Sequence, residues 1–560
     1  MSRHVLPDRA AASGARPGRA PFLARHRDEA KVSHRRPVRL SIAINHDGAQ
    51  PLKCGRACAG QPDNAGADNR DIKNAGDGRF RADDLLDLWR APRSILSVSV
   101  DGVASLFRGR LRHGPPDDLA RVTARLHRAL EKANPILFTS FAGLAGFAAY
   151  FSMYAFRKPF SVALFSEVPG WHFVLDYKIA LVLAQVLGYA VSKLIGVKVI
   201  AEITPNKRAV AILVLIFLSW LALVLFAVIP APWNVFTMFL NGLPLGLIWG
   251  LVFGFMEGRR TSEVLGAILC ASFIVSSGAV KSLGKLLMDD WHVSPFWMPA
   301  AAGALFFPLL GLSVWVLSQL PAPSAQDEAA RVRRAPMDGA ARACFLQRYG
   351  LGLALLVLCY LLVTAIRDFR DNFAAEIWTA LGFGHAAAVF TASELPVAVL
   401  SLTVLAVIIV VRDNTKALLV IHGVVIAGLL LLGVSTLAFQ AGLLSPLAWM
   451  ILSGAGLYMA YVPFNAMLFD RLIAASGTVG TAGFLIYVAD ASGYLGSCAL
   501  LVWRNFGLTQ LNWLQVFTAS AYGTSVAGMI LMSLSALYFV RRTAPIKPYG
   551  IEASHHPARP

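Results

Sequence analysis

Arg157 lies at the end of a long apolar run, in the segment MYAFRKPF, and its chemistry directs the interpretation of the chain. An arginine near hydrocarbon costs about 2.5–3.5 kcal/mol on insertion scales, so it should have a partner or a ligand. Tyr150, Tyr154 and Arg157 are spaced i, i+4 and i+7, which places them on one face of a helix. A planar guanidinium suits the paired oxygens of a phosphate or carboxylate, and tyrosine hydroxyls donate to the same oxygens. This face is therefore predicted to bind an anion.

A second arginine repeats this arrangement 210 residues later. The pattern Y-x4-A-x-R ends once at Arg157 and again at Arg367. Two guanidiniums that face one aqueous space repel each other unless an anion lies between them. Arg157 and Arg367 are therefore predicted to hold the anion together, with Lys193 of GYAVSKLIG reaching the same space. The alternative for RDFRD is internal neutralisation by Asp368 and Asp371.

Other ionisable residues also lie within apolar runs. Asp490, in YVADASGYLG, has no adjacent cation and is interpreted either as a proton- or cation-coupling site or as the internal partner of Lys281. Glu394 is a weaker case of the same kind. Lys193 could instead extend to the membrane surface, and this surface position is the one expected for Lys158.

The motifs of other function classes are missing from the sequence. It contains no GxxxxGK[ST] nucleotide loop and no GxSxG hydrolase motif. The cysteines and histidines have no metal-ligand spacing, since the CxxxC of Cys54 and Cys58 has no second pair. No metal, cofactor or enzymatic activity is therefore expected. Glycine-rich stretches such as GLPLGLIWGLVFG are interpreted as sites of close helix packing.

The composition is typical of a membrane protein, since 56% of the 560 residues are hydrophobic and 15% are charged. From Pro135 onward, apolar runs alternate with short polar breaks, as a bilayer about 30 Å thick requires. The predicted fold class is an all-α polytopic membrane protein with twelve transmembrane helices in two six-helix pseudo-repeats. The helices are expected at residues 136–156, 177–197, 209–229, 233–256, 263–287, 296–319, 350–368, 387–411, 416–439, 445–468, 478–503 and 513–540.

The repeats define the expected domains: two six-helix bundles at 133–320 and 350–543, joined by a central loop at 321–349. Lysine and arginine gather in the loops that share a side with both termini, so both termini and this loop are predicted to be cytoplasmic. Two parallel repeats describe the major facilitator architecture, with a site between the halves near the midplane.

Both ends of the chain are expected to be cytoplasmic tails. Residues 544–560 form the short C-terminal one, and residues 1–132 are predicted to be a disordered basic tail, or to lie upstream of the true start. Within the longer tail, DDLARVTARLHRALEK has the apolar spacing of a short amphipathic helix at the membrane surface. The alternative is a solvated segment without a specific role.

Several segments resemble the organophosphate:phosphate antiporter family of the major facilitator superfamily. AAYFSMYAFRKPFSVALF is similar to its first helix, GYAVSKLIG to the second, YLLVTAIRDF to the seventh and TAGFLIYVADASGYLGS to the eleventh. DDWHVSPFWMPA is similar to the start of the sixth helix, and SELP to part of the eighth. The resemblance implies rocker-switch exchange of an organic phosphate for inorganic phosphate. It also implies that Arg157 and Arg367 bind phosphate and that Tyr150 and Tyr154 line the site.

The chain also departs from that family. Ser272 stands where the family has a histidine near the phosphate, and the loops AEITPNKRA and MEGRRTSE differ from the family's pattern. In these respects the chain resembles an uncharacterised bacterial branch of the superfamily, a domain of unknown function. The departures bear on the substrate more than on the fold.

Together these features predict a monomeric transporter in a bacterial inner membrane. It would move a small anionic solute, such as an organic phosphate, by alternating access and without ATP. Its partners would be the solute and the lipid bilayer, with no nucleic acid. Two alternatives remain open: a proton-coupled major facilitator carrier of a non-phosphate solute that uses Asp490, and a non-transporting membrane sensor or scaffold of the same fold.

Overall fold

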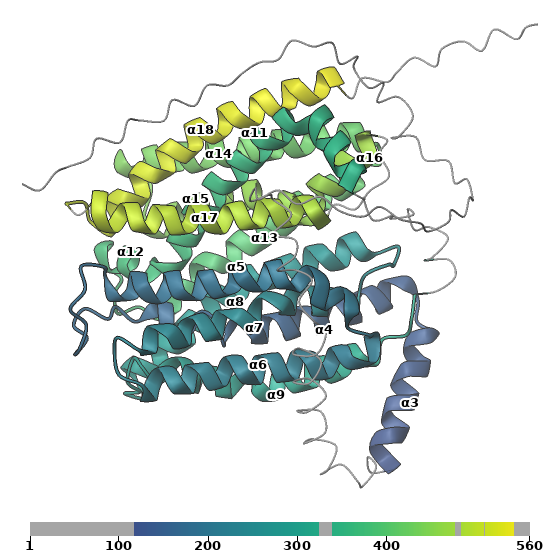
Figure 1. Ribbon diagram of the computed structural model, residues 1–560, viewed down its shortest axis with the longest axis horizontal. Helices are drawn as coiled ribbons and strands as arrows, with labels where there is room; N and C mark the ends of the chain where they lie inside the picture. The colour runs from purple at the N-terminus through teal and green to yellow at the C-terminus, as the bar shows by residue number, and fades with distance from the viewer. Residues whose placement is uncertain (1–116, 324–326, 328–338, 477–482, 509, 543–560) are drawn as a thin grey trace, which may run out of the picture. The chain divides into compact units, whose positions relative to one another are not determined.

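The computed structural model describes residues 117–323, 327, 339–476, 483–508 and 510–542 (Figure 1). All of them belong to one compact unit, Cys54–Pro560. The regular secondary structure of this described part is entirely helical. The predicted tail, apart from residues 117–132, and the predicted segment 544–560 lie outside the described residues.

Six long helices precede the central segment and six follow it. The first six are α4 (Pro135–Tyr154), α5 (Tyr177–Glu202), α6 (Pro205–Val228), α7 (Asn234–Phe253), α8 (Ser262–Asp289) and α9 (Met298–Ser318). The second six are α11 (Gly339–Asn372), α13 (Ala388–Val410), α14 (Asn414–Gln440), α15 (Pro446–Pro463), α17 (Gly483–Gly507) and α18 (Trp513–Arg542). Shorter helices are α3 (Asp117–Glu131), η2 (Pro159–Val162), α12 (Ala374–Ala380), η3 (Phe464–Leu468) and α16 (Phe469–Ser476).

Ten helical segments of the described chain are long and apolar enough to cross a bilayer. The other two long helices, α5 and α17, contain 26 and 25 residues, which is also sufficient length. Both pack as members of the bundle, because α5 lies against α7 and α17 lies against α11. The chain is therefore an all-α polytopic membrane protein.

The long helices occur where the apolar runs predict them, with differences mainly at their ends. The largest difference is in α11, which begins at Gly339, inside the expected central loop at 321–349. The sequence there, GAARACFLQRY, is rich in helix-forming residues and contains no proline, so the helix extends beyond its apolar part. The short helix α12 was not predicted, because its seven residues are too few for a periodic pattern.

The two halves have the same internal packing. In the first half, α4 packs against α8 and α9, α6 against α7 and α9, and α5 against α7. The corresponding helices of the second half repeat this, since α11 packs against α17 and α18, α14 against α15 and α18, and α13 against α15. The halves meet where α8 packs against α13 and where α5 packs against α17. These two contacts are equivalent, because α8 corresponds to α17 and α5 corresponds to α13 in the other half. This is the arrangement of two parallel six-helix repeats.

Glycines allow the closest helix contacts within each half. A Cβ atom at Gly188 of α5 would collide with the backbone of α7, and one at Gly242 of α7 would collide with the backbone of α5. Gly428 and Gly456 have the same reciprocal relationship between α14 and α15. The packing role predicted for the stretch that contains Gly242 is therefore confirmed.

Candidate solute-binding site

Arg157 is buried and has no acidic partner among the described residues. It lies just after α4 and is 9% exposed. Its guanidinium carbon lies 4.1 Å from the ring centroid of Tyr189 and 5.8 Å from that of Tyr154. Within the described chain, no carboxylate forms an ion pair with it, and its buried Nε has no hydrogen-bond partner. Such a guanidinium keeps donors available for an anion.

The end of α4 brings Arg157 into the protein. The helix ends at Tyr154, where two successive backbone N–H groups, those of residues 157 and 158, donate to the Tyr154 carbonyl at 3.0 and 2.9 Å. Beyond this point the backbone is no longer α-helical, so its carbonyls need other donors. The Gln185 side chain donates to the Arg157 carbonyl at 3.1 Å, and the Asn241 side chain donates to the Phe156 carbonyl at 3.0 Å. Helices α5 and α7 therefore hold this turn in place.

Arg367 occupies a similar aromatic setting but has an acidic partner. Its guanidinium carbon lies 3.7 Å from the ring centroid of Tyr461, and its Nη2 lies 2.5 Å from Oδ1 of Asp368. In the part of the chain that the structure describes, internal neutralisation therefore applies to Arg367 and not to Arg157.

Tyrosines surround these arginines. Tyr150 and Tyr154 are both buried, and their rings meet edge to face with centroids 5.7 Å apart. Tyr189 of α5 meets Tyr494 of α17 at 5.3 Å, which is an aromatic contact between the halves. The sequence interpretation missed Tyr189, although it lies one helical turn before Lys193 and its spacing could have indicated a shared face.

Lys193 forms an ion pair across the two halves. Its Nζ lies 3.5 Å from Oδ2 of Asp490, and the Tyr360 hydroxyl donates to Oδ1 of the same carboxylate at 2.6 Å. Lys193 therefore points into the protein and not to the membrane surface. Of the two interpretations of Asp490, the one that pairs it with Lys281 is wrong, because each residue has another partner.

Asp371 binds two lysines from the opposite half. Lys158 contacts its Oδ2 and Lys281 contacts its Oδ1. Lys158 also donates to the side chain of Asn372 at 2.8 Å and is 3% exposed. The predicted surface position of Lys158 is therefore wrong. The chain turns inward after α4, where the carboxylate of Asp371 compensates the cost of burying the ammonium.

Two further ion pairs complete the buried network. Lys178, at the start of α5, is paired with Glu376 of α12 and was not predicted, because a lysine at a helix end suggests a surface position. Glu394 pairs with Arg370 at 2.6 Å, and Arg370 also donates to the Met450 carbonyl at 2.9 Å. Glu394 therefore takes part in an ion pair within the second half.

The charges that surround Arg157 do not cancel. We define the central charge cluster as Arg157, the neighbouring pair of Arg367 and Asp368, and the seven charged side chains of the buried ion pairs that join the two halves. None of these ten side chains is more than 15% exposed. Its formal charge is positive by two, since it contains six cations and four carboxylates among the described residues. The cations are Arg157, Lys158, Lys178, Lys193, Lys281 and Arg367, and the carboxylates are Asp368, Asp371, Glu376 and Asp490.

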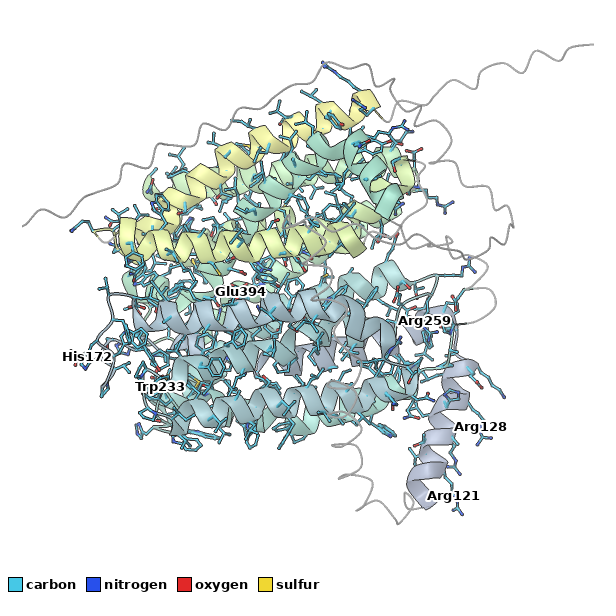
Figure 2. The ribbon with its side chains drawn as sticks, viewed as in Figure 1. Arg121, Arg128, His172, Trp233, Arg259 and Glu394 are labelled. Atoms are coloured by element: carbon cyan, nitrogen blue, oxygen red, sulfur yellow. The ribbon has the colours of Figure 1, made fainter. Side chains whose placement is uncertain are left out.

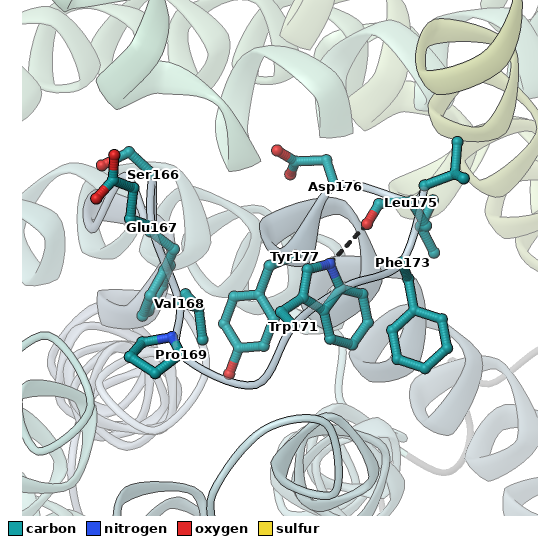
Figure 3. A pocket seen from close by; sticks show the side chains of 11 residues that line it. Ser166, Glu167, Val168, Pro169, Trp171, Phe173, Leu175, Asp176 and Tyr177 are labelled. Carbon is teal, nitrogen blue, oxygen red and sulfur yellow. Dashed lines mark hydrogen bonds between the residues drawn. The ribbon is translucent and has the colours of Figure 1, made fainter.

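A large open pocket lies elsewhere, in the loop before α5. It has a volume of about 740 Å³ and is lined by residues 165–169, 171 and 173–177 (Figure 3). Trp171 shapes its wall by donating from the indole nitrogen to the Leu175 carbonyl at 2.7 Å. Its charged lining residues are Glu167 and Asp176, so its chemistry does not suit an anion.

Residues 159–542 match a family described as "Family of unknown function (DUF5690)". The chain belongs to this family. The matched range includes Lys193, Arg367 and Asp490, and it begins two residues after Arg157. The family agrees with the expected domain of unknown function, while the likeness to organophosphate:phosphate antiporters stays a prediction. No curated protein matches the chain.

Several solved structures have a related arrangement of helices. A D-xylose-proton symporter is 15% identical with a TM-score of 0.47, covering 72% of this chain and 96% of its own. A bacterial homologue of the human drug peptide transporters is 16% identical with a TM-score of 0.48, covering 72% and 99%. A POT family transporter in complex with a thioalcohol-conjugated peptide is 12% identical with a TM-score of 0.47, covering 73% and 96%. Each TM-score is below 0.5, so these likenesses do not bear on the substrate of this chain.

Proposed function

We propose that this protein is a secondary transporter that moves a small anionic solute by alternating access, without ATP. The observation that carries this proposal is the buried guanidinium of Arg157, which is stacked on Tyr189 and forms no ion pair within the described chain. Burying an uncompensated charge is expensive, and an anionic solute would offset that cost. The guanidinium fork suits the paired oxygens of phosphate or carboxylate.

The charge of the surrounding network supports an anion. The central charge cluster has two more cations than carboxylates. A solute with one or two negative charges would bring the cluster close to neutrality, which is favourable in a medium of low dielectric constant. Arg367, a member of the same cluster, would contribute to this attraction, with Tyr150, Tyr154 and Lys193 around the solute.

Ion pairs between the halves support alternating access. At the end of the bundle predicted to face outside, Asp371 joins Lys158 and Lys281, and Glu376 joins Lys178. At the opposite end, Arg471 of α16 forms an ion pair with Glu263 of α8, with 3.3 Å between Nη2 and Oε2. The side chain of Glu263 is 48% exposed. Exposed ion pairs contribute little to stability, whereas buried ones hold strongly when formed. We infer that this conformation is closed at the end predicted to face outside.

Counterflow in proteoliposomes tests the proposal. Purified protein is reconstituted with unlabelled phosphate, organic phosphates or carboxylates inside, and entry of the labelled anion is measured. Saturable exchange of at least one anion is expected. If no anion exchanges while the protein remains folded and monodisperse, the anion carrier proposal fails. A thermal-shift screen selects the anions, because a ligand that binds only the native state raises its apparent stability.

A proton-coupled carrier is the second candidate, and Asp490 is the observation that favours it. Its carboxylate bridges Lys193 of the first half and Tyr360 of the second, so a proton on Asp490 would weaken a contact between the halves. Uptake driven by an imposed pH gradient distinguishes the two candidates. In a coupled carrier Asp490→Asn would abolish gradient-driven uptake but preserve exchange, whereas in an uncoupled exchanger the wild type would not respond to the gradient.

A further inference from the structure

The short helix α3 ends at the level where the membrane begins. The spanning helix α4 starts at Pro135 and has 20 residues, which at 1.5 Å per residue corresponds to about 30 Å, the thickness of the hydrocarbon core. Asn134 caps α4 by accepting a hydrogen bond from the Leu137 N–H at 2.7 Å. Because α3 ends at Glu131, its last turn lies within a few residues of this boundary.

The direction of α3 differs from that of the spanning helices. In Figure 1 it runs across their common direction, at the end of the bundle where α16 lies, and does not continue the line of α4. Its C-terminal part is anchored there, because Nδ1 of His127 lies 2.9 Å from the carbonyl oxygen of Gln319, just after α9. Leu130, next to this contact, is 7% exposed. The earlier turns of α3 extend past the bundle (Figure 1).

The apolar residues of α3 share one face of the helix. Val122, Leu126 and Leu130 are each one turn apart and so share one face of the helix. Leu130 is buried, Leu126 is half-buried, and Val122 is 50% exposed. Burial on this face therefore decreases toward the N-terminus.

The rest of α3 has the polarity of an interfacial helix. Arg121, Arg125 and Arg128 are exposed on the other side of the helix, and Figure 2 shows Arg121 and Arg128 directed away from the bundle. Long arginine side chains can lie along a membrane surface with their guanidiniums among lipid phosphates. The first turn of α4, separated from the end of α3 by three residues, also presents apolar side chains, since Ile136 is 80% exposed and Leu137 is 60% exposed.

We propose that α3 binds the bilayer surface, with Val122 and Leu126 in the boundary between headgroups and acyl chains and the arginines among the phosphates. The partner is the membrane leaflet at this end of the bundle, which is predicted to be cytoplasmic. A helix with one apolar and one basic face binds in this way through buried apolar area and attraction to anionic lipid. The proposal is independent of the transported solute, since α3 has no residue in the central charge cluster.

Nitroxide accessibility in nanodiscs tests the proposal on the full chain. A nitroxide is introduced as a noncanonical amino acid at Val122 or at Arg125, which leaves the six native cysteines unchanged. The nanodiscs contain phosphatidylcholine and phosphatidylglycerol. Collision rates with oxygen, which concentrates in lipid, and with a water-soluble nickel complex are compared. We expect an oxygen-to-nickel ratio at least about threefold higher at position 122 than at position 125, because only residue 122 faces the lipid.

Two results would overturn the proposal. If the labels at positions 122 and 125 have equal collision rates and both are accessible to the nickel complex, α3 is solvated. If the label at position 122 has low collision rates with both reagents, protein covers this face. Leu126 and Arg128 provide a second pair of positions, with the same expectation. Val122→Glu supplies an independent readout: it should raise nickel accessibility at residue 126 by about threefold and leave the melting temperature of the bundle unchanged, since Val122 is half exposed.

Discussion

Lys158 and Asp371 form a buried ion pair that joins the two halves of the protein. Lys158 belongs to the turn after α4, and Asp371 lies in the last turn of α11. The other carboxylate oxygen of Asp371 contacts Lys281 of α8. One carboxylate thus serves two ammonium groups, and the side chains of both lysines are 4% exposed.

This shared carboxylate predicts unequal effects of substitution. Asp371→Asn leaves two buried lysines without their counter-ion, so it should destabilise the protein by about 3–5 kcal/mol. Lys158→Met or Lys281→Met leaves a balanced pair and should cost clearly less. Thermal unfolding in detergent measures the loss of stability in each of the three variants. The control is Asp289→Asn, which removes a half-exposed pair with Lys285 and should change stability by less than about 1 kcal/mol. Equal losses in all three network variants would contradict the shared role of Asp371.

The pair of Lys178 and Glu376 predicts a second pattern, that of a double-mutant cycle. Lys178→Met or Glu376→Leu alone should cost about 3–5 kcal/mol, because each leaves a buried charge without its partner. The double variant should be close to wild type, since apolar residues can replace a buried ion pair at little cost. Chemical unfolding monitored by fluorescence gives the coupling energy. Additive losses would mean that the two residues act separately.

Arg157→Lys should weaken anion binding at least tenfold, which corresponds to about 1.4 kcal/mol. Lysine preserves the charge but lacks the planar fork that binds two oxygens and stacks on Tyr189. The measurement is the anion concentration that gives half of the maximal thermal shift. Arg504→Lys is a matched control, because Arg504 stacks on Trp513 at 4.3 Å and lies outside the central charge cluster. Unchanged affinity in Arg157→Lys would exclude a bidentate role for Arg157.

The glycine contacts between α5 and α7 predict a stability difference between two glycine-to-alanine variants. Gly242→Ala should destabilise the protein by about 1–3 kcal/mol, because its Cβ would collide with the backbone of α5. Gly423→Ala, within α14, should be neutral or stabilising by up to about 1 kcal/mol, since no atom lies within 4 Å of its Cβ. Melting temperatures of the two variants provide the comparison. A stable Gly242→Ala variant would show that α5 and α7 can separate without cost.

Much of the fold could be predicted from the chain because the relevant signals are local. The length of each apolar run sets the length of a spanning helix, and the spacing of Tyr150, Tyr154 and Arg157 sets a shared face. The repeated pattern that ends at Arg157 and Arg367 indicated two related halves, and the packing of both halves follows one scheme. The unpredicted helix α12 and the early start of α11 lie where no long apolar run marks the structure.

The partners of the buried charges could not be predicted in the same way. Lys158 and Asn372 are 214 residues apart, and nothing near either residue indicates their contact. Asp490 has an isolated position in its helix, so several cations could have been its partner, and only the packing of α5 against α17 brings Lys193 to it.

The sequence by itself therefore determined where the long apolar helices lie, that they form two repeats, and which helix faces carry arginine and tyrosine. Tertiary structure alone decided that Lys158 and Lys281 share Asp371, that Lys193 meets Asp490, and that Arg157 has no acidic partner in the described chain. The physical reason is that the two kinds of interaction act over different distances along the chain. Helix formation depends on neighbours within a few residues, whereas the pairing of buried charges depends on how distant helices pack, which fixes the partner available to each charge.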